Sequence, residues 1–400
     1  MQLAMTMMIR DAADVIEANL RYHHAQGVDL FVVADNGSTD GTLAILERYQ
    51  QAGLAKIERM PGPPGVMWKE ARTKIARRAC ELGADWVILN DDDEFWWPLT
   101  GDLKETLAAI PERFGMVVGP RTEFVARPGE SFFADRLTIR EARFLRPPKA
   151  AHRPHPRIVV RNAHPTQIWL ENAPAGAFAG RPGLRGSGAD HAAKANLELL
   201  FAPTYPIRIL HFPIRSFAQY RRRVEIANAA QLLEDEDREK VRTAFETGRL
   251  DEVYDALTLS DEEVAKGIAE GWLVEDTDFR DYLAVCPDPL TGGEAPAGSR
   301  AWPLERRELE LAELELDAMY ALTRYVRGDR TGDRGGRHQV HTGTEGRLRR
   351  RLQRRDRRIE RLERRLGDAE RRLRDIRGSR WWRLRPRLPG RVRRQSVRNS

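Results

Sequence analysis

The sequence predicts an α/β fold built on a mostly parallel β-sheet, and three observations support this prediction. Short apolar runs alternate with amphipathic helical stretches over the first 125 residues. Polar clusters follow directly after two of the apolar runs. The composition, 41% hydrophobic and 32% charged, is typical of a folded globular protein. Alternation of this kind forms βαβ units, so we expect the carboxyl ends of the strands, where ligands of open α/β sheets bind, at one edge.

The individual elements follow from hydrophobic spacing. The predicted strands are residues 3–9, 30–34, 86–89, 157–160 and 206–212, and the predicted helices of the first half are residues 11–25, 42–52 and 68–82. Ser38 or Thr39 is the expected N-cap of the second helix. Residues 127–188 are rich in Pro, Gly and Arg and are interpreted as long loops over the sheet.

The second half of the chain is predicted to be mainly helical. Apolar residues recur at close to 3.5-residue spacing in the Arg-rich tail, which predicts a C-terminal coiled coil. The predicted domains are an α/β domain over residues 1–225, a helical extension over 226–327, a linker over 328–346 and an Arg-rich coiled-coil and basic tail over 347–400.

Charge is distributed unevenly between body and tail. Residues 345–400 contain 23 arginines, no lysine and 7 acidic residues, a net charge of +16, so the overall +7 leaves −9 for the preceding 344 residues. Such asymmetry indicates an anionic partner for the tail. Trp381 and Trp382 among arginines suit an anionic membrane surface. A solvated helix that forms a homodimer and nucleic-acid binding are the alternatives, and nucleic acid is the least favoured.

The sequence shows no targeting or membrane segment. No apolar stretch approaches the roughly 20 residues that span a bilayer. Residues 1–10 lack the basic region and cleavage site of a signal peptide. Cys80 and Cys286 form no disulfide framework and fit a reducing compartment. We therefore expect a cytoplasmic protein, which the tail would bring to the inner face of the membrane.

The sharpest motif is the acidic run Asp91–Glu94, which directly follows a predicted buried strand. Consecutive carboxylates repel one another unless solvent or a cation offsets their charge. On an extended segment alternate side chains point the same way, so Asp91 and Asp93 are expected to converge. Oxygen ligands of this kind suit Mg²⁺ or Mn²⁺ shared with a substrate diphosphate. The alternative is a solvated acidic turn that caps a helix after Pro98.

The second motif is the turn Asp35–Thr42, which follows the second predicted strand. Glycines permit tight turning, and the amino end of the next helix offers free N–H groups to an anion. Asp35 can accept a hydrogen bond from a base or a ribose hydroxyl. A purely structural turn is the alternative.

Four ordered segments, residues 10–16, 22–29, 35–42 and 91–95, together resemble glycosyltransferase family 2, in its branch with a D-x-D-E-F signature. The resemblance covers roughly residues 3–225. It implies a GT-A fold, a Rossmann-like and mostly parallel sheet, with a nucleotide-sugar donor and inversion at the anomeric carbon. The resemblance implies that Asp35 binds the nucleoside and that Asp91 and Asp93 hold the metal and diphosphate. The nucleotide-binding candidates are Asp11, Asp35, Asn36, Ser38 and Asp91. The branch usually has an acidic residue where this chain has Ala12, and Asp11 or Asp14 is expected to replace it.

Other candidates lie further along the chain. His164 and His211 resemble positions of the same branch, and His211, at the end of an apolar strand, can reach the metal as a third ligand. A buried structural histidine is the alternative. The candidates for phosphate or acceptor contacts are His164, Lys149, Arg157 and Arg215. The candidates for the general base that an inverting transfer requires are Asp190 and Glu171, followed by Asp92. Trp96, Trp97 and Trp169 are candidates for stacking against sugar or base, with core packing the alternative.

The sequence therefore predicts an inverting, metal-assisted glycosyltransferase whose acceptor is a bacterial surface glycan or a lipid-linked saccharide. Two alternatives remain. One is an inactive nucleotide-sugar-binding or interaction protein, which Ala12 supports. The other is a nucleotidyltransferase, although residues 5–14 lack the Gly-rich phosphate loop of that class.

Overall fold

A computed structural model describes residues 1–60, 62, 68–99, 101–110, 112, 114–142, 146–160, 168–170, 207–229 and 236–292. The chain divides into two compact units, residues 1–340 and 341–400. All described residues belong to the first unit. His164, Glu171, Asp190, the predicted linker and the predicted coiled-coil tail lie outside the described residues.

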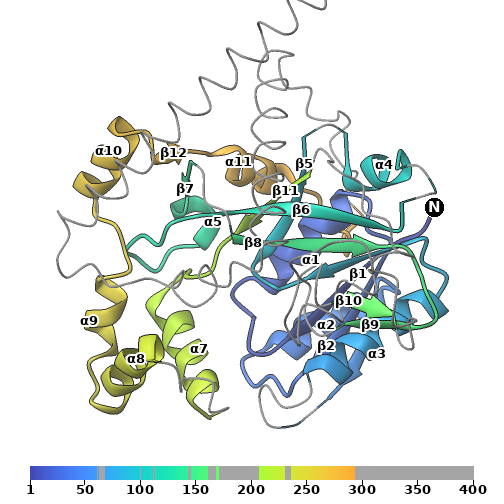
Figure 1. Ribbon diagram of the computed structural model, residues 1–400, viewed down its shortest axis with the longest axis horizontal. Coiled ribbons are helices and arrows are strands. Elements are labelled where there is room, and N and C mark those ends of the chain that lie inside the picture. The colour runs from blue at the N-terminus through green and yellow to red at the C-terminus, as the bar shows by residue number, and fades with distance from the viewer. Residues whose placement is uncertain are drawn as a thin grey trace, which may run out of the picture. The chain divides into compact units, whose positions relative to one another are not determined.

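The core of the first unit is an eight-stranded sheet with the order β3-β2-β1-β4-β8-β6-β11-β5 (Figure 1). Its strands are β1 (Leu3–Ile9), β2 (Leu30–Asp35), β3 (Ala55–Arg59), β4 (Trp86–Asn90), β5 (Glu94–Pro98), β6 (Met116–Glu123), β8 (Arg146–His152) and β11 (Ile207–His211). Neighbouring strands from β3 to β4 are parallel, β8 is antiparallel to both β4 and β6, and β5 is antiparallel to β11. The prediction of a mostly parallel α/β sheet is confirmed.

Both faces of the sheet are buried, which explains the continuous apolar runs of its parallel strands. Along β1, Leu3, Met5 and Met7 pack on one face and Ala4 on the other. The first face is covered by α1 (Ile16–Ala25), α2 (Thr42–Gln51), α4 (Leu103–Ala108), α5 (Phe133–Arg136) and α11 (Asp278–Val285). The second face is covered by α3 (Trp68–Glu81) and the hairpin of β9 (Ile158–Val160) and β10 (Ile168–Leu170).

The chain after β11 adds two smaller clusters. Helices α7 (Phe217–Ala229), α8 (Glu236–Glu246) and α9 (Leu250–Asp255) lie side by side around their own apolar core (Figure 1). Helix α10 (Asp261–Ala269) packs with β12 (Leu273–Glu275), which pairs with β7 (Ile139–Glu141). Among the described residues, no helix is both long and apolar enough to cross a bilayer.

The first helix begins five residues later than predicted, because the chain bends at residue 11 and forms a turn at residues 13–15 instead. Asp11 has a φ of 53°, and its backbone N–H donates to Ser38 Oγ. The next two amides donate to Thr42 Oγ1 and to Asp40 Oδ2. The predicted cap at Ser38 or Thr39 is also wrong, since Gly41 is the N-cap of α2.

The interpretation of residues 127–188 as loops is also wrong in part. The segment supplies β8, which lies inside the sheet and pairs with β4 and β6. The sequence of β8 begins Arg-Pro-Pro and includes a lysine, so local propensity argues against a central strand. Pairing partners distant in sequence decide the conformation here. The strand β5 was likewise missed, because its aromatic residues follow the acidic run without a turn signal.

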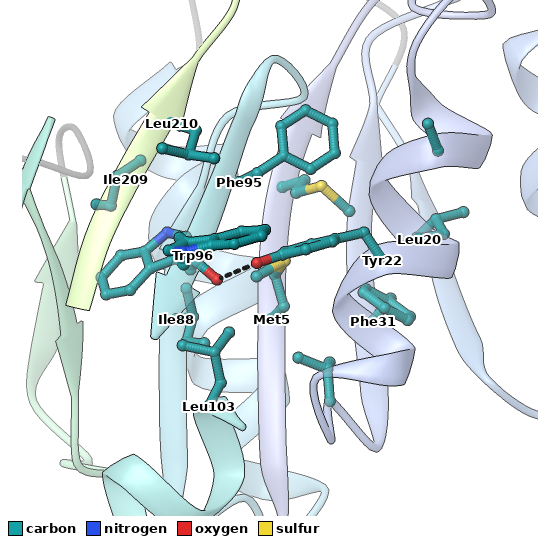
Figure 2. Packing of buried hydrophobic residues seen from close by; sticks show 14 of the residues in the cluster. Met5, Leu20, Tyr22, Phe31, Ile88, Phe95, Trp96, Leu103, Ile209 and Leu210 are labelled. Carbon is teal, nitrogen blue, oxygen red and sulfur yellow. Dashed lines mark hydrogen bonds between the residues drawn. The ribbon is translucent and has the colours of Figure 1, made fainter. Parts of the chain in front are cut away.

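Helix α1 is tied to β5 by buried polar groups as well as by packing. The Tyr22 hydroxyl donates to the Trp96 carbonyl over 3.0 Å, at the centre of the apolar cluster in Figure 2. The backbone N–H of Trp96 donates to His23 Nε2 over 3.1 Å, and His23 Nδ1 is 2.9 Å from the Asn19 backbone carbonyl. Burial lowers the pKa of His23 to about 3, despite the opposing hydrogen bond to Asn19. The ring is therefore neutral in the folded protein.

His23 makes stability pH-dependent in a defined window. In the unfolded chain its pKa is near 6.5, so between about pH 6.5 and pH 3 the unfolded state binds the extra proton and stability falls as pH falls. For His23→Gln we expect the free energy of unfolding, measured by urea denaturation, to depend less steeply on pH, by up to about 1.4 kcal/mol per pH unit. The assignment would be contradicted if the free energy of unfolding changed equally with pH in variant and wild type between pH 4 and 6, so that the difference between the two proteins stayed the same as at pH 8.

Candidate active site

The predicted site residues gather at the carboxyl edge of the sheet. Asp11 follows β1, Asp35 ends β2, and Asp91 follows β4. Strand β1 pairs with β2 on one side and with β4 on the other, in registers that bring Ile9 beside Asp35 and Met7 beside Asn90. The direction of strand succession reverses at β1, and such a switch point opens a crevice at the strand ends.

The turn after β2 is held by its own polar side chains. Asp35 is buried, and its carboxylate accepts from the Gly37 N–H at 3.2 Å and the Ser38 N–H at 3.3 Å. Asn36 Nδ2 donates to the Met60 carbonyl at 3.0 Å. Asp35, Asn36 and Ser38 thus shape this turn, whatever ligand it receives. Their nucleotide contacts stay a prediction.

The acidic run forms a reverse turn between β4 and β5. The Glu94 N–H donates to the Asp91 carbonyl at 3.2 Å, so the segment is not extended and the expected convergence of Asp91 and Asp93 is not observed. Asp91 instead accepts from Arg72 Nη2 at 2.8 Å and from Lys149 Nζ. Asp93 Oδ2 lies 3.5 Å from His211 Nε2.

Protein cations compensate the carboxylates around Asp91. Burial opposes ionisation of Asp91, but Lys149 and Arg72 hold its pKa well below the usual range. The Lys149 side chain is only 1% exposed, and its Nζ lies 3.2 Å from Glu94 Oε1. Arg121 Nη1 donates to the same Glu94 oxygen at 2.8 Å. Lys149, predicted to contact phosphate, is thus a buried partner of two acidic residues.

Asp92 and Asp93 differ although they are adjacent. Burial opposes ionisation of Asp93, yet His211, Arg223 and Arg215 lower its pKa below the usual range. Burial and the neighbouring charge of Asp93 raise the pKa of Asp92 to about 7, against the opposing charge of Arg215. The Asp92 side chain remains 26% exposed. The site therefore favours the ionised form of Asp93 and disfavours that of Asp92.

His211 is held between two carboxylates. Its Nδ1 lies 3.0 Å from Glu123 Oε1, and its Nε2 faces Asp93. Burial lowers the pKa of His211, but Asp93 and Glu123 raise it by more, so it lies above the usual value. Sequence reasoning missed Glu123. It ends β6 and stands opposite His211 in the register of β6 and β11, a pairing that no local pattern reveals.

Three of these groups fit a divalent cation. Ligand atoms of Asp93, Glu94 and His211 lie within 4.8 Å of one another. Glu94 Oε2 is buried without a hydrogen-bond partner, which leaves one carboxylate oxygen available. Two carboxylates and an imidazole suit Mn²⁺ or Mg²⁺ that keeps open positions for a substrate. Asp91 is not a member of this group.

Three arginines in the chain that follows β11 complete the site. Arg215 is buried and binds Asp14 through two contacts, at 2.6 and 3.0 Å. Arg222 Nη2 lies 3.0 Å from Asp11 Oδ2 and Arg223 Nη1 3.6 Å from Asp93 Oδ2. These two α7 side chains are 40% and 55% exposed. Sequence reasoning missed them, although three consecutive arginines shortly after His211 were a visible signal.

Other candidates lie elsewhere. His152 pairs with Val87 near the start of β4, so the chain that follows it lies at the opposite edge of the sheet. Arg157, which precedes β9 in this chain segment, is therefore not brought to the acidic turn. Trp96 and Trp97 are 0% and 5% exposed and pack in the core. This agrees with the alternative prediction of core packing and not with stacking against a sugar or base.

Residues 13–169 match the model of glycosyl transferase family 2. This segment is glycosyl transferase family 2-like. The match includes the turn after β2 and the acidic turn after β4, and over these residues it confirms the resemblance to family 2. No curated protein sequence matches the chain.

The chain also has remote likenesses among solved structures. S. aureus TarS residues 1–349 in complex with UDP-GlcNAc is 13% identical over 82% of this chain and 92% of that chain, with a TM-score of 0.32. Glucosyl-3-phosphoglycerate synthase from Mycobacterium tuberculosis with Mn²⁺, UDP and phosphoglyceric acid is 20% identical over 30% of this chain and 43% of that chain, with a TM-score of 0.22. Scores this low do not define a shared fold.

Lys149 is expected to be essential for stability. Lys149→Met leaves Asp91 and Glu94 with less compensation in a buried setting, which typically costs about 3–5 kcal/mol. The matched control is Lys104→Met, because Lys104 pairs with Asp29 at 2.6 Å but both side chains are about a third exposed, where such a pair contributes less than about 1 kcal/mol. Urea denaturation measures both. Similar small losses for the two variants would show that the buried pairs are not needed.

Proposed function

We propose that this protein is a glycosyltransferase that moves a sugar from a nucleoside-diphosphate donor to an acceptor hydroxyl, with inversion and with Mn²⁺ or Mg²⁺. The observation that carries the proposal is the group of Asp93, Glu94 and His211 beside the turn after β2, at one edge of the sheet. The family 2 match over residues 13–169 includes the acidic turn and supports this interpretation.

The donor would lie across the two turns. Asp11, Asp35, Asn36 and Ser38 would border the nucleoside, and the diphosphate would extend toward the acidic turn. Asp93, Glu94 and His211 would hold a divalent cation, whose charge offsets the negative charge that develops on the leaving nucleoside diphosphate. Glu123 orients the His211 ring through Nδ1, so that Nε2 faces the ligand position, an arrangement common for metal-bound histidines.

We assign direct phosphate contacts to Arg222 and Arg223. The buried cations Lys149 and Arg215 are committed to carboxylates, whereas these two α7 side chains are substantially exposed and can turn toward a ligand. Their present partners, Asp11 and Asp93, are themselves residues of the proposed donor site. Ligand binding would therefore exchange an arginine–carboxylate contact for an arginine–phosphate contact.

The acceptor is proposed to be a saccharide of a bacterial surface glycan or a lipid-linked saccharide. Asp190 and Glu171 remain candidates for the base that takes the proton from its hydroxyl. Residues 347–400, with their basic charge, would place the domain at an anionic membrane surface. An inactive nucleotide-sugar-binding protein and a nucleotidyltransferase remain as alternatives.

The donor site is tested by calorimetric titration of UDP and GDP, with and without Mn²⁺. We expect metal-dependent binding of one of them, weakened at least about tenfold in Asp93→Asn because a charged ligand is lost. Asp85→Asn is the matched control, since Asp85 lies just before β4, at the opposite edge of the sheet. A well-folded wild type that binds no nucleoside diphosphate would sink the proposal. Slow hydrolysis of the bound nucleotide-sugar would separate an enzyme from an inactive binding protein.

The role of α7 predicts a distinct phosphate dependence. Arg223→Gln should weaken UDP binding about tenfold, since a hydrogen bond between charged groups contributes about 1.5 kcal/mol or more, and should leave UMP binding nearly unchanged. Arg221→Gln is the control on the same helix, because Arg221 is exposed and pairs with Glu225 at 3.1 Å. Equal losses for UDP and UMP would contradict a role at the terminal phosphate.

A further inference from the structure

Asn19 is a buried residue of α1 that lies directly behind the acidic turn. Its side chain is completely inaccessible to solvent. The Nδ2 group donates to the Asp92 carbonyl at 2.8 Å and to the Glu94 carbonyl at 3.0 Å. These carbonyls belong to the residues on either side of Asp93, so a single amide group holds the backbone at both flanks of that carboxylate.

A third hydrogen bond, between two backbone groups, connects the same turn to the end of the strand that carries His211. The Asp93 carbonyl accepts from the Phe212 N–H at 2.9 Å, and Phe212 directly follows His211. The backbone around Asp93 is therefore held by Asn19 of α1 and by the residue that follows β11. The distance between Asp93 Oδ2 and His211 Nε2, 3.5 Å, depends on these bonds, because no covalent neighbour links the two residues.

Helix α1 carries a second buried polar group, which bonds to a different part of the chain. The Tyr22 hydroxyl donates to the Trp96 carbonyl at 3.0 Å, inside the packed cluster of Figure 2. Tyr22 is as completely buried as Asn19, but its bond secures β5 three residues beyond Asp93. The two residues thus provide a comparison between a bond that fixes the acidic turn and one that fixes the adjacent strand.

We propose that Asn19 is a positioning residue that sets Asp93 at the correct place relative to His211 for the two to share a divalent cation. The proposal rests on the metal-assisted function proposed above. A ligand set works only when its members are held within about 0.5 Å of the productive geometry, and loss of outer partners of metal ligands typically lowers affinity 10- to 100-fold. Asn19 does not touch the metal position, so its effect passes through the backbone of residues 92–94.

The test compares Asn19→Leu, similar in size but without the amide donors, with Tyr22→Phe as the matched control. Mn²⁺ affinity is measured by titration in the presence of UDP, and thermal unfolding is recorded for each protein. We expect Asn19→Leu to bind Mn²⁺ about 10- to 100-fold more weakly. Tyr22→Phe should retain affinity within about twofold. Both variants are expected to unfold at lower temperature, because Tyr22→Phe loses one buried hydrogen bond and Asn19→Leu loses at least two.

The outcomes separate this inference from the proposed function. A wild type that binds no Mn²⁺ with UDP overturns the proposed metal site, and the inference with it. A wild type that binds, together with a folded Asn19→Leu of unchanged affinity, overturns the role of Asn19 alone, as does an equal loss of affinity in Tyr22→Phe. If Asn19→Leu does not fold, Asn19→Ser serves instead, since a hydroxyl has one donor and cannot hold both carbonyls.

Discussion

Compensation of buried negative charge is the constraint on which the rest of this structure depends. Five carboxylates, those of Asp91, Asp92, Asp93, Glu94 and Glu123, crowd at one edge of the sheet, and an uncompensated charge there would cost several kcal/mol. The cations that offset them come from distant parts of the chain: Arg72 from α3, Arg121 from β6, Lys149 from β8, and His211 and Arg215 from the end of β11 and the residues after it. The sheet order brings all of them to one place.

This compensation also explains why an unusual strand lies at the centre of the sheet. β8 has a sequence that does not favour a strand, yet it lies between β4 and β6 and delivers Lys149 to Asp91 and Glu94. Two ion pairs in a buried setting are strengthened by the low local dielectric. Electrostatics and strand pairing together therefore select a conformation that local propensity disfavours.

Under the proposed function, the same charges prepare the site before the donor arrives. Dipoles and charges that are fixed in advance need little reorganisation when charge develops on a leaving group. The buried cations are fixed by their carboxylates, and the exposed α7 arginines are the ones that can exchange partners. Behind the turn, α1 contributes neutral polar groups, Asn19, Tyr22 and His23, which fix the backbone without adding charge.

Within the first 90 residues, the sequence by itself determined three strands, the three helices that lie between them and the two polar turns, but it missed β3 and the exact start of α1. The reason is that hydrophobic periodicity and turn chemistry are local, and parallel strands place their carboxyl ends together. The resemblance to family 2 added His211 to the candidate site residues, because the resemblance depends on several motifs that follow one another in order.

Tertiary structure alone decided which side chain meets which. The reverse turn at residues 91–94 sends Asp91 toward Lys149 and Asp93 toward His211, whereas an extended segment would have brought the two aspartates together. Glu123, Arg222 and Arg223 joined the site through strand register and helix packing. Contacts of this kind join residues that are far apart in sequence, and no local pattern encodes their distances.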